Sequence, residues 1–287
     1  MKSIAFLTMG DLGIHHCDDD LAQAPLARLG WAVSSVSWHE PPEDWGRYGA
    51  VIVRSTWDYQ HHPRAFWALL ESIQARGVVL ENPLDLMGWN MDKTYLRELE
   101  TLGIGIVPTL WGRGDPLGCY GEFCVKLGEE KLVIKPRVSA SAEDTFVIGC
   151  DRDLDRVARL FRNREWMVQA FMGAVIDEGE FSLFYFNGVL SHVVLKQPHP
   201  GDFRVQEEYG GQTLWVKDVE PDLVTAGQGV MNGLDASPLY ARVDMVRGDG
   251  EFLLMELELI EPSLFLSVDP GAPERFARAI DHRLGNL

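Results

Sequence analysis

The chain has 287 residues, of which 46% are hydrophobic, and a formal net charge of −17 at pH 7. This length suits two or three packed lobes, and this apolar fraction allows a full core. The acidic excess disfavours nucleic acid and anionic membrane as partners, so we expect a small-molecule partner. The four cysteines form no CxxC pair, which indicates reduced thiols in a cytoplasmic protein.

Strands and helices alternate through the first third of the chain. The patterns predict strands at 3–8, 31–38, 50–55 and 78–82, and helices at 18–30 and 63–77. Such alternation is typical of a parallel sheet with right-handed crossovers. The stretch NPLDL breaks the pattern, and we place the end of a first lobe at residue 88.

The middle of the chain continues with both types of element. We expect a helix at 90–103, a strand at 104–109, a glycine-rich loop at 111–122, a strand at 131–138, a helix at 153–164 and a strand at 166–172. The last part has two predicted hairpins, at 181–196 with a turn at Asn187-Gly188 and at 240–259. Helices are expected at 221–234 and 273–285, so the fold class is α/β with antiparallel sheets in the last two thirds.

The segment EFLLMELELIEPSLFLS, residues 251–267, combines an apolar strand with carboxylates. Glu256 and Glu258 lie two residues apart, so they share one face of the strand with Cα atoms roughly 6.6 Å apart. Burying two unpaired carboxylates costs on the order of several kcal/mol each, so that face needs cations or water. Glu261 lies an odd number of residues from Glu256 and Glu258, so its side chain points to the other face of the strand unless Pro262 bends the chain.

The preceding strand, YARVDMV, carries Arg242 and Asp244, again two residues apart. If the loop that connects the two strands has an even number of residues, Asp244 faces away from Glu256. An odd loop pairs Asp244 with Leu254 and Arg242 with Glu256, and all four charged residues then share a face. We predict an odd loop or a bulge, because Gly248 and Gly250 permit one.

Three carboxylates beside one arginine suit Mg²⁺, which prefers carboxylate oxygens and often bridges substrate phosphates. Two such ions about 4 Å apart would suit phosphoryl transfer. The alternative on these strands alone is a solvent-exposed sheet face with ordinary charges.

Five segments in the same order resemble the ATP-grasp superfamily and, within it, the glutathione synthetase-like carboxylate–amine ligases. They are NMDKTYLRELETLGIGIVPT, LVIKPRVSASAEDTF, MVQAFMGAVIDEGEFSLFYFNG, YARVDMV and MELELIEPSLF. The segments RSTWDY and ELELIEPSLF are similar to those of the cyclo-ligase that closes the D-cycloserine ring from O-ureido-D-serine. The resemblance implies an ATP-grasp fold of three lobes, at 1–88, 89–168 and 169–287, and favours a homodimer.

The resemblance also assigns roles to single residues. It implies that ATP and Mg²⁺, as two ions, are bound by the central and last lobes. The implied ATP-binding residues are Lys93, Lys135, Ser139, Ser141, Gln169, Ala170, Phe171, Glu180 and Lys196. The implied Mg²⁺ ligands are Asp244, Glu256 and Glu258. Arg242, Lys135 and Arg204 are implied to be catalytic, because they would lie near the transferred phosphoryl group.

We infer the substrate-binding residues from their positions in the predicted fold. Arg54 ends a predicted parallel strand, where open α/β sheets bind ligands, and its guanidinium could hold a carboxylate. Ser55, Thr56 and Asp58 follow it, and Ser263 is a further candidate. Asp18 could receive an amino group, although capping a helix is at least as good an explanation. These residues suit an amino acid or a close derivative.

Three functions are open at this stage. The first is intramolecular ring closure through an acyl phosphate, the second is ligation of two amino-acid-like molecules, and the third is nucleotide binding by a non-catalytic regulatory protein. The third would require loss of the phosphate lysines or the Mg²⁺ ligands, and the sequence retains residues at all those positions.

Overall fold

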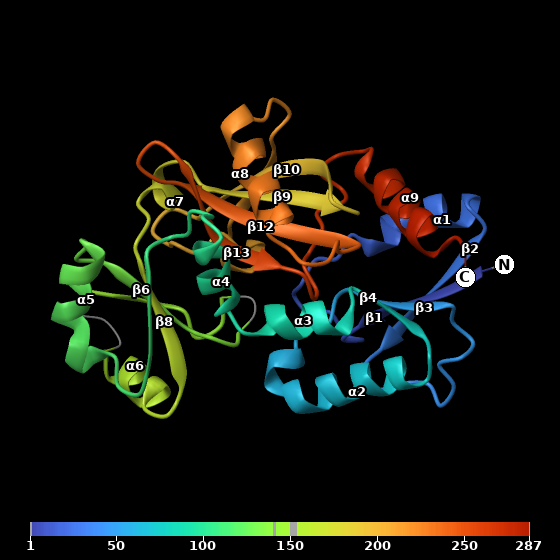
Figure 1. Ribbon diagram of the computed structural model, residues 1–287, viewed down its shortest axis with the longest axis horizontal. Coiled ribbons are helices and arrows are strands. Elements are labelled where there is room, and N and C mark those ends of the chain that lie inside the picture. The colour runs from blue at the N-terminus through green and yellow to red at the C-terminus, as the bar shows by residue number, and fades with distance from the viewer. Residues whose placement is uncertain (1, 140–141, 150–153, 287) are drawn as a thin grey trace.

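The computed structural model describes residues 2–139, 142–149 and 154–286, which form three β-sheets flanked by helices (Figure 1). No helix among these residues has the length and apolar character needed to cross a bilayer. The predicted Ser141 lies outside the described residues.

The first sheet is parallel, as the alternating pattern predicts. Its strands, in spatial order, are β2 (Trp31–Ser37), β1 (Lys2–Thr8), β3 (Ala50–Val53) and β4 (Val79–Glu81). The helical elements of this part are η1 (Asp19–Ala22), α1 (Gln23–Arg28), η2 (Tyr59–His61), α2 (Pro63–Ala75) and α3 (Leu84–Met91). Buried apolar side chains cover both faces of this sheet, which is why β3 and the middle of β1 consist of hydrophobic residues.

The second sheet is antiparallel and lies farthest from the amino terminus (left in Figure 1). Its spatial order is β5 (Thr109–Arg113), β8 (Glu165–Ala170), β6 (Leu132–Pro136) and β7 (Phe146–Ile148). The helical elements of this region are α4 (Tyr95–Thr101), η3 (Leu117–Cys119), α5 (Tyr120–Leu127) and α6 (Leu154–Phe161).

Two predictions for this region are wrong. Residues 104–108 form no strand apart from a bridge between Ile106 and Leu254, and the strand begins at Thr109 instead. The expected loop at 111–122 contains the rest of β5 and the start of α5. Pro108 has no backbone N–H to give to a ladder, and the strand begins just after it.

The third sheet has five antiparallel strands in the order β11 (Gln212–Trp215), β10 (Val189–Gln197), β9 (Glu180–Phe186), β12 (Tyr240–Arg247) and β13 (Phe252–Glu258). Its region also holds α7 (Ala174–Asp177), η4 (Glu207–Tyr209), α8 (Pro221–Asn232) and α9 (Ala272–Leu284). The hairpin turn at Asn187-Gly188 is confirmed, with both residues at positive φ.

The β12–β13 hairpin confirms the predicted bulge. Its loop is even, because Arg247 pairs with Phe252, and the register then shifts between Asp244 and Met245. The shift brings Asp244 opposite Glu256 and Arg242 opposite Glu258, not the partners expected for an odd loop. All four charged residues therefore share one face of the sheet.

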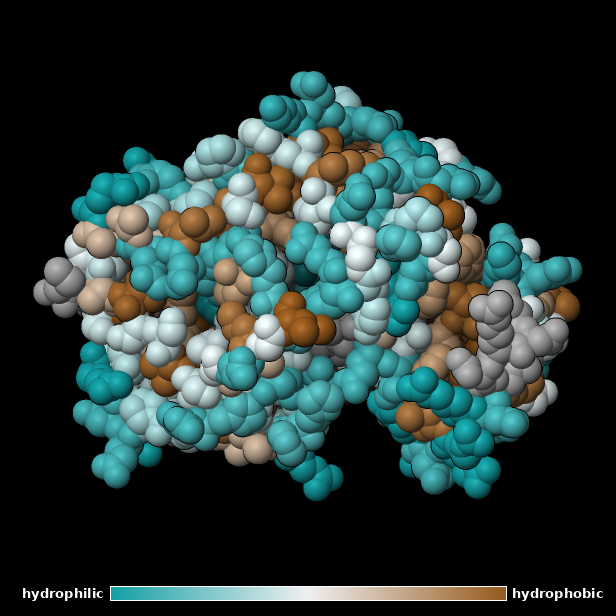
Figure 2. Space-filling view, turned by 180° about the vertical axis from the view of Figure 1, so that it is seen from behind, coloured by the Kyte–Doolittle hydropathy of each residue, from teal (hydrophilic) through white to brown (hydrophobic). Residues whose placement is uncertain are grey.

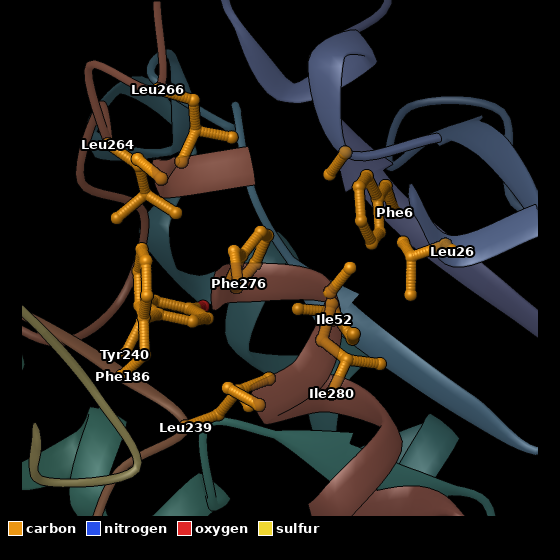
Figure 3. Packing of buried hydrophobic residues seen from close by; sticks show 14 of the residues in the cluster. Phe6, Leu26, Ile52, Phe186, Leu239, Tyr240, Leu264, Leu266, Phe276 and Ile280 are labelled. Atoms are coloured by element: carbon orange, nitrogen blue, oxygen red, sulfur yellow. The ribbon is translucent and has the colours of Figure 1, made fainter. Parts of the chain in front are cut away.

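Helix α9 joins the first sheet to the third. Phe276 and Ile280 of α9 pack in one cluster with Phe6 and Ile52 of the first sheet and with Phe186 of β9 (Figure 3). These five side chains are at most 4% exposed. The packing fixes the amino-terminal sheet relative to the strands that carry the charged face.

Candidate active site

A cavity of about 220 Å³ lies where the three sheets approach one another. Its wall includes side chains from β6, β8, β9, β10, β12 and β13, and from loops near residues 15, 57 and 206. Seen from behind, the surface is mostly hydrophilic, with a notch at its lower edge between two lobes (Figure 2). The cavity brings together most of the residues predicted from the sequence.

Arg242 lies at the centre of the charged face. Its Nε is 3.1 Å from both Asp244 carboxylate oxygens, and its NH2 group also contacts Glu258. Burial alone would raise the pKa of Asp244, but Arg242 and Lys196 outweigh it and the pKa is lowered. Burial raises the pKa of Glu258 to about 7, with Asp244 and Glu256 adding to the rise.

Two lysines, Lys93 and Lys135, approach the same face from the central region. Lys93 Nζ is 3.0 Å from Glu256 and donates to the Ser139 carbonyl oxygen at 2.7 Å. The burial of Lys135 lowers its pKa, and in the described part of the chain no carboxylate forms an ion pair with it. Lys135 is thus a buried ammonium group whose donors face the cavity without an ion pair.

A second cluster lies on β8, β9 and β10. Lys196 forms an ion pair with Glu180 and lies 3.5 Å from Asp244. Burial is the main cause that raises the pKa of Glu180. The Gln169 side chain is buried and donates to Thr109 Oγ1 at 3.1 Å, and Ala170 and Phe171 continue the wall beside it.

The remaining predicted residues divide into two groups. Arg204 lines the cavity, paired with Asp202 and lying over the Tyr209 ring, and Ser263 also lines it. The structure does not bring Arg54, Ser55, Thr56, Asp58 or Asp18 to the cavity wall.

Arg54 is buried in the protein, because its guanidinium is held by Asp19 at 2.9 Å and by the Pro262 carbonyl oxygen at 2.9 Å. Asp58 is turned toward Trp38 and His39, and Asp18 accepts from Ser267. Ser55 Oγ donates to Thr8, and Thr56 is fully buried. For these five residues the substrate role stays a prediction, and Trp57 and Tyr59 of the same segment line the cavity.

The structure adds cavity residues that the sequence reasoning did not select. They include His15, Trp57, Tyr59, Glu208 and Glu261. Glu261 reaches the cavity because β13 ends at Glu258, so alternation no longer sets its direction. The motif WDY and the glutamate before Pro262 were visible in the sequence, but nothing in them marked these side chains as cavity residues.

The predicted Mg²⁺ ligands face the cavity together, but they are held by cations. Within the described ranges, no three His, Cys, Asp or Glu side chains converge closely enough to form a metal cluster. Mg²⁺ is usually bound through one or two carboxylates together with substrate phosphates. The opposed pair Asp244 and Glu256 offers such a donor set, so the residues present fit the ion.

Comparison with known proteins gives consistent results. Residues 4–82 match the model of the D-cycloserine synthetase DcsG amino-terminal domain family. The chain is 30% identical, over 276 residues, to the cycloserine biosynthesis protein DcsG of Streptomyces lavendulae, a match that covers 89% of this chain and 90% of the relative.

Solved structures extend the comparison to the whole fold. The crystal structure of D-cycloserine synthetase DcsG matches with a TM-score of 0.86 at 27% identity and covers 98% of this chain and 99% of that one. A D-alanine–D-alanine ligase from Bacillus anthracis matches with a TM-score of 0.67 at 14% identity, over 100% of this chain and 98% of that one. The second match supports the ATP-grasp fold alone.

Proposed function

Because the chain belongs to the D-cycloserine synthetase DcsG family, we propose that it closes a ring in an amino-acid-like substrate through an acyl phosphate. The coarser activity follows from membership itself: the protein is an ATP-grasp carboxylate–amine ligase that forms a carbon–nitrogen bond and releases ADP. The alternative of a non-catalytic regulatory protein is set aside on the same ground.

One observation carries the proposal most directly. Four cations, Lys93, Lys135, Lys196 and Arg242, line a single cavity together with a carboxylate pair on adjacent strands. Phosphoryl transfer needs little from a protein beyond positioning and neutralisation of charge. Lys135 supports the phosphoryl-transfer role most strongly, because a buried ammonium group without an ion pair can donate hydrogen bonds to a phosphate oxygen.

In the proposed first step, a substrate carboxylate oxygen attacks the γ-phosphorus of ATP, and the bond to the β-phosphate oxygen breaks to give an acyl phosphate and ADP. Lys135 and Arg242 would neutralise charge on the transferred group. Gln169 would contact the adenine, with Glu180 on the ribose. Bound Mg²⁺, as two ions held by Asp244, Glu256 and Glu258, would supply charge neutralisation for the phosphates.

In the second step, a nitrogen lone pair of the substrate attacks the acyl carbon, and phosphate leaves with the bonding electrons. The nitrogen loses its proton, and an amide-type bond results. If the nitrogen belongs to the same molecule, the product is a ring. If it belongs to another molecule, the product is a dipeptide-like or γ-glutamyl amide.

The test is ADP release with Mg²⁺ and ATP, measured for O-ureido-D-serine and for the common amino acids in D and L forms, with mass spectrometry of the products. A product that contains atoms of only one substrate molecule and lacks one water, or for O-ureido-D-serine one water together with the carbamoyl group, supports ring closure. A product that joins two substrates supports the intermolecular ligase instead. Absence of ADP release with every compound would overturn the proposal.

A further inference from the structure

Glu261 is a buried carboxylate in the cavity wall that the ligase mechanism does not use. It lies three residues after the end of β13, in the segment EPSLF, and is 8% exposed. Within the described part of the chain, no cation forms an ion pair with its carboxyl; Lys93 and Arg242 pair with Glu256 and Glu258 instead. The buried cavity carboxylates Glu180 and Asp244, by contrast, are each paired with a lysine or an arginine.

A buried carboxylate without a cationic partner lowers the stability of the folded protein. Burial raises the pKa of Glu261 to about 8, and the negative charge of Glu258 adds to the rise. An unpaired buried charge costs several kcal/mol, unless a partner compensates for the water that it has lost. A cationic group on a bound molecule would be such a partner.

The surroundings of Glu261 are built from two separate parts of the chain. Trp57 Nε1 donates to the Glu261 carbonyl oxygen at 2.8 Å, which ties the loop after β3 to the loop after β13. Tyr59 is 4% exposed and lines the same cavity. Burial raises the pKa of its hydroxyl, and the negative charge of Glu261 adds to the rise.

The cavity that holds Glu261 and the phosphate-binding cations suits a small molecule. Lys93 and Arg242 line the same cavity as Glu261, and its volume is about 220 Å³. Three residues of chain span at most about 10 Å, which limits how far Glu261 can lie from Glu258. A molecule the size of an amino acid can therefore have its carboxylate near Arg242 and its ammonium group near Glu261.

We propose that Glu261, which lines the same cavity as Tyr59, binds the ammonium group of an amino-acid substrate and so selects substrates that carry a primary amine. This inference rests on the proposed ligase function for its kinetic consequences. The binding event itself needs no chemistry, so it can be tested independently.

The test compares two compounds that differ only in the amine: O-ureido-D-serine and 3-(ureidooxy)propanoic acid, which keeps the carboxylate but lacks the α-amino group. A charged hydrogen bond of this kind corresponds to roughly 30-fold or more in affinity. In Glu261→Gln, we expect kcat/KM for O-ureido-D-serine to fall by roughly that factor, mainly through KM. Values for the desamino compound and the KM for ATP should stay within about threefold. Equal losses for both compounds would overturn the proposal.

Glu207→Gln is the matched control, because it removes the same charge from an exposed carboxyl that also lines the cavity. This substitution should leave kcat/KM for both compounds unchanged. The melting temperature of Glu261→Gln should equal or exceed that of the wild type, since the carboxyl has no cationic partner to lose. A marked drop in melting temperature would indicate a structural role and count against the proposal.

Isothermal titration calorimetry distinguishes failure of the ligase proposal from failure of the proposed role of Glu261. The same amine-bearing and desamino compounds are titrated into the protein, together with the common D and L amino acids. Amine-dependent binding that Glu261→Gln abolishes, without any ADP release, would refute the ligase proposal and support the role of Glu261. Binding that ignores the amine, or no binding of any of these compounds at millimolar concentration, would refute the role of Glu261.

Discussion

Asn82 is the residue whose loss should loosen the whole site most. It is fully buried just after β4, and its Nδ2 donates to the carbonyl oxygens of Tyr240 and Leu259 at 2.9 and 2.7 Å. Its Oδ1 accepts from the backbone N–H groups of Leu239 and Tyr240 at 2.7 and 3.4 Å. One amide side chain thus fastens the amino-terminal sheet to the start of β12 and to the residue after β13.

The magnitude of Asn82→Ala follows from these four contacts. Each buried hydrogen bond contributes about 1 kcal/mol net, and the substitution also leaves buried backbone groups without partners, so we expect a loss of about 4 kcal/mol in the free energy of unfolding. For a chain of 287 residues the entropy of unfolding is about 0.6 kcal/mol per kelvin, so the melting temperature should fall by about 7 °C. Since β12 and β13 carry Arg242 and Glu256, ADP release should fall as well.

The assay is urea denaturation followed by circular dichroism, with calorimetry for the melting temperature. Asn232→Ala is the control, because Asn232 is exposed at the end of α8 and should change stability by less than about 0.5 kcal/mol. A loss of under about 1 kcal/mol for Asn82→Ala would refute the reasoning, since it would mean that the four contacts are replaced or contribute nothing.

Three further predictions concern the cavity and the core. Glu256→Gln should reduce ADP release by about 100-fold or more with an unchanged circular dichroism spectrum, and near-normal ADP release would contradict its assignment. Lys135→Met should raise the KM for ATP without destabilising the protein, because Lys135 has no ion pair to lose; an unchanged KM would exclude phosphate contact. Burial lowers the pKa of His192 to about 4, against a hydrogen bond to the Leu264 carbonyl oxygen. The folded protein therefore resists protonation, and stability should fall by about 3 kcal/mol as the pH drops from 6.5 to 4. In denaturation measured as a function of pH, His192→Gln should lack this part of the loss of stability at acid pH. An equal dependence of stability on pH in the variant and the wild type would contradict the prediction.

The charged face of β12 and β13 could be predicted from the sequence because it depends on local rules. Side chains alternate along strands, so Arg242 and Asp244 share a face, as do Glu256 and Glu258. Only the relation between the two strands was open, and the requirement that charges share a face called for an odd loop or a bulge. The bulge after Asp244 meets that requirement.

Contacts between distant segments could not be predicted in this way. Arg54 directly follows a parallel strand, where ligands commonly bind, but the sequence does not reveal that Asp19 reaches its guanidinium. The region 104–113 shows a related limit, because its apolar residues suit a strand while Pro108 delays the ladder until Thr109. Glu261 shows a third, since alternation predicts direction only while the strand continues.

The ion pairs inside the cavity explain how a densely charged site can fold before its substrates arrive. Lys93 is paired with Glu256 and Lys196 with Glu180, so these four buried charges have partners in the folded chain. Where phosphate oxygens replace these carboxylates on the lysines, the carboxylates become available to a cation. Two groups stand outside this exchange because they have no ionic partner to give up, the ammonium of Lys135 and the carboxyl of Glu261. Their opposite charges match the two ends of the proposed reaction, a phosphate at Lys135 and an ammonium group at Glu261.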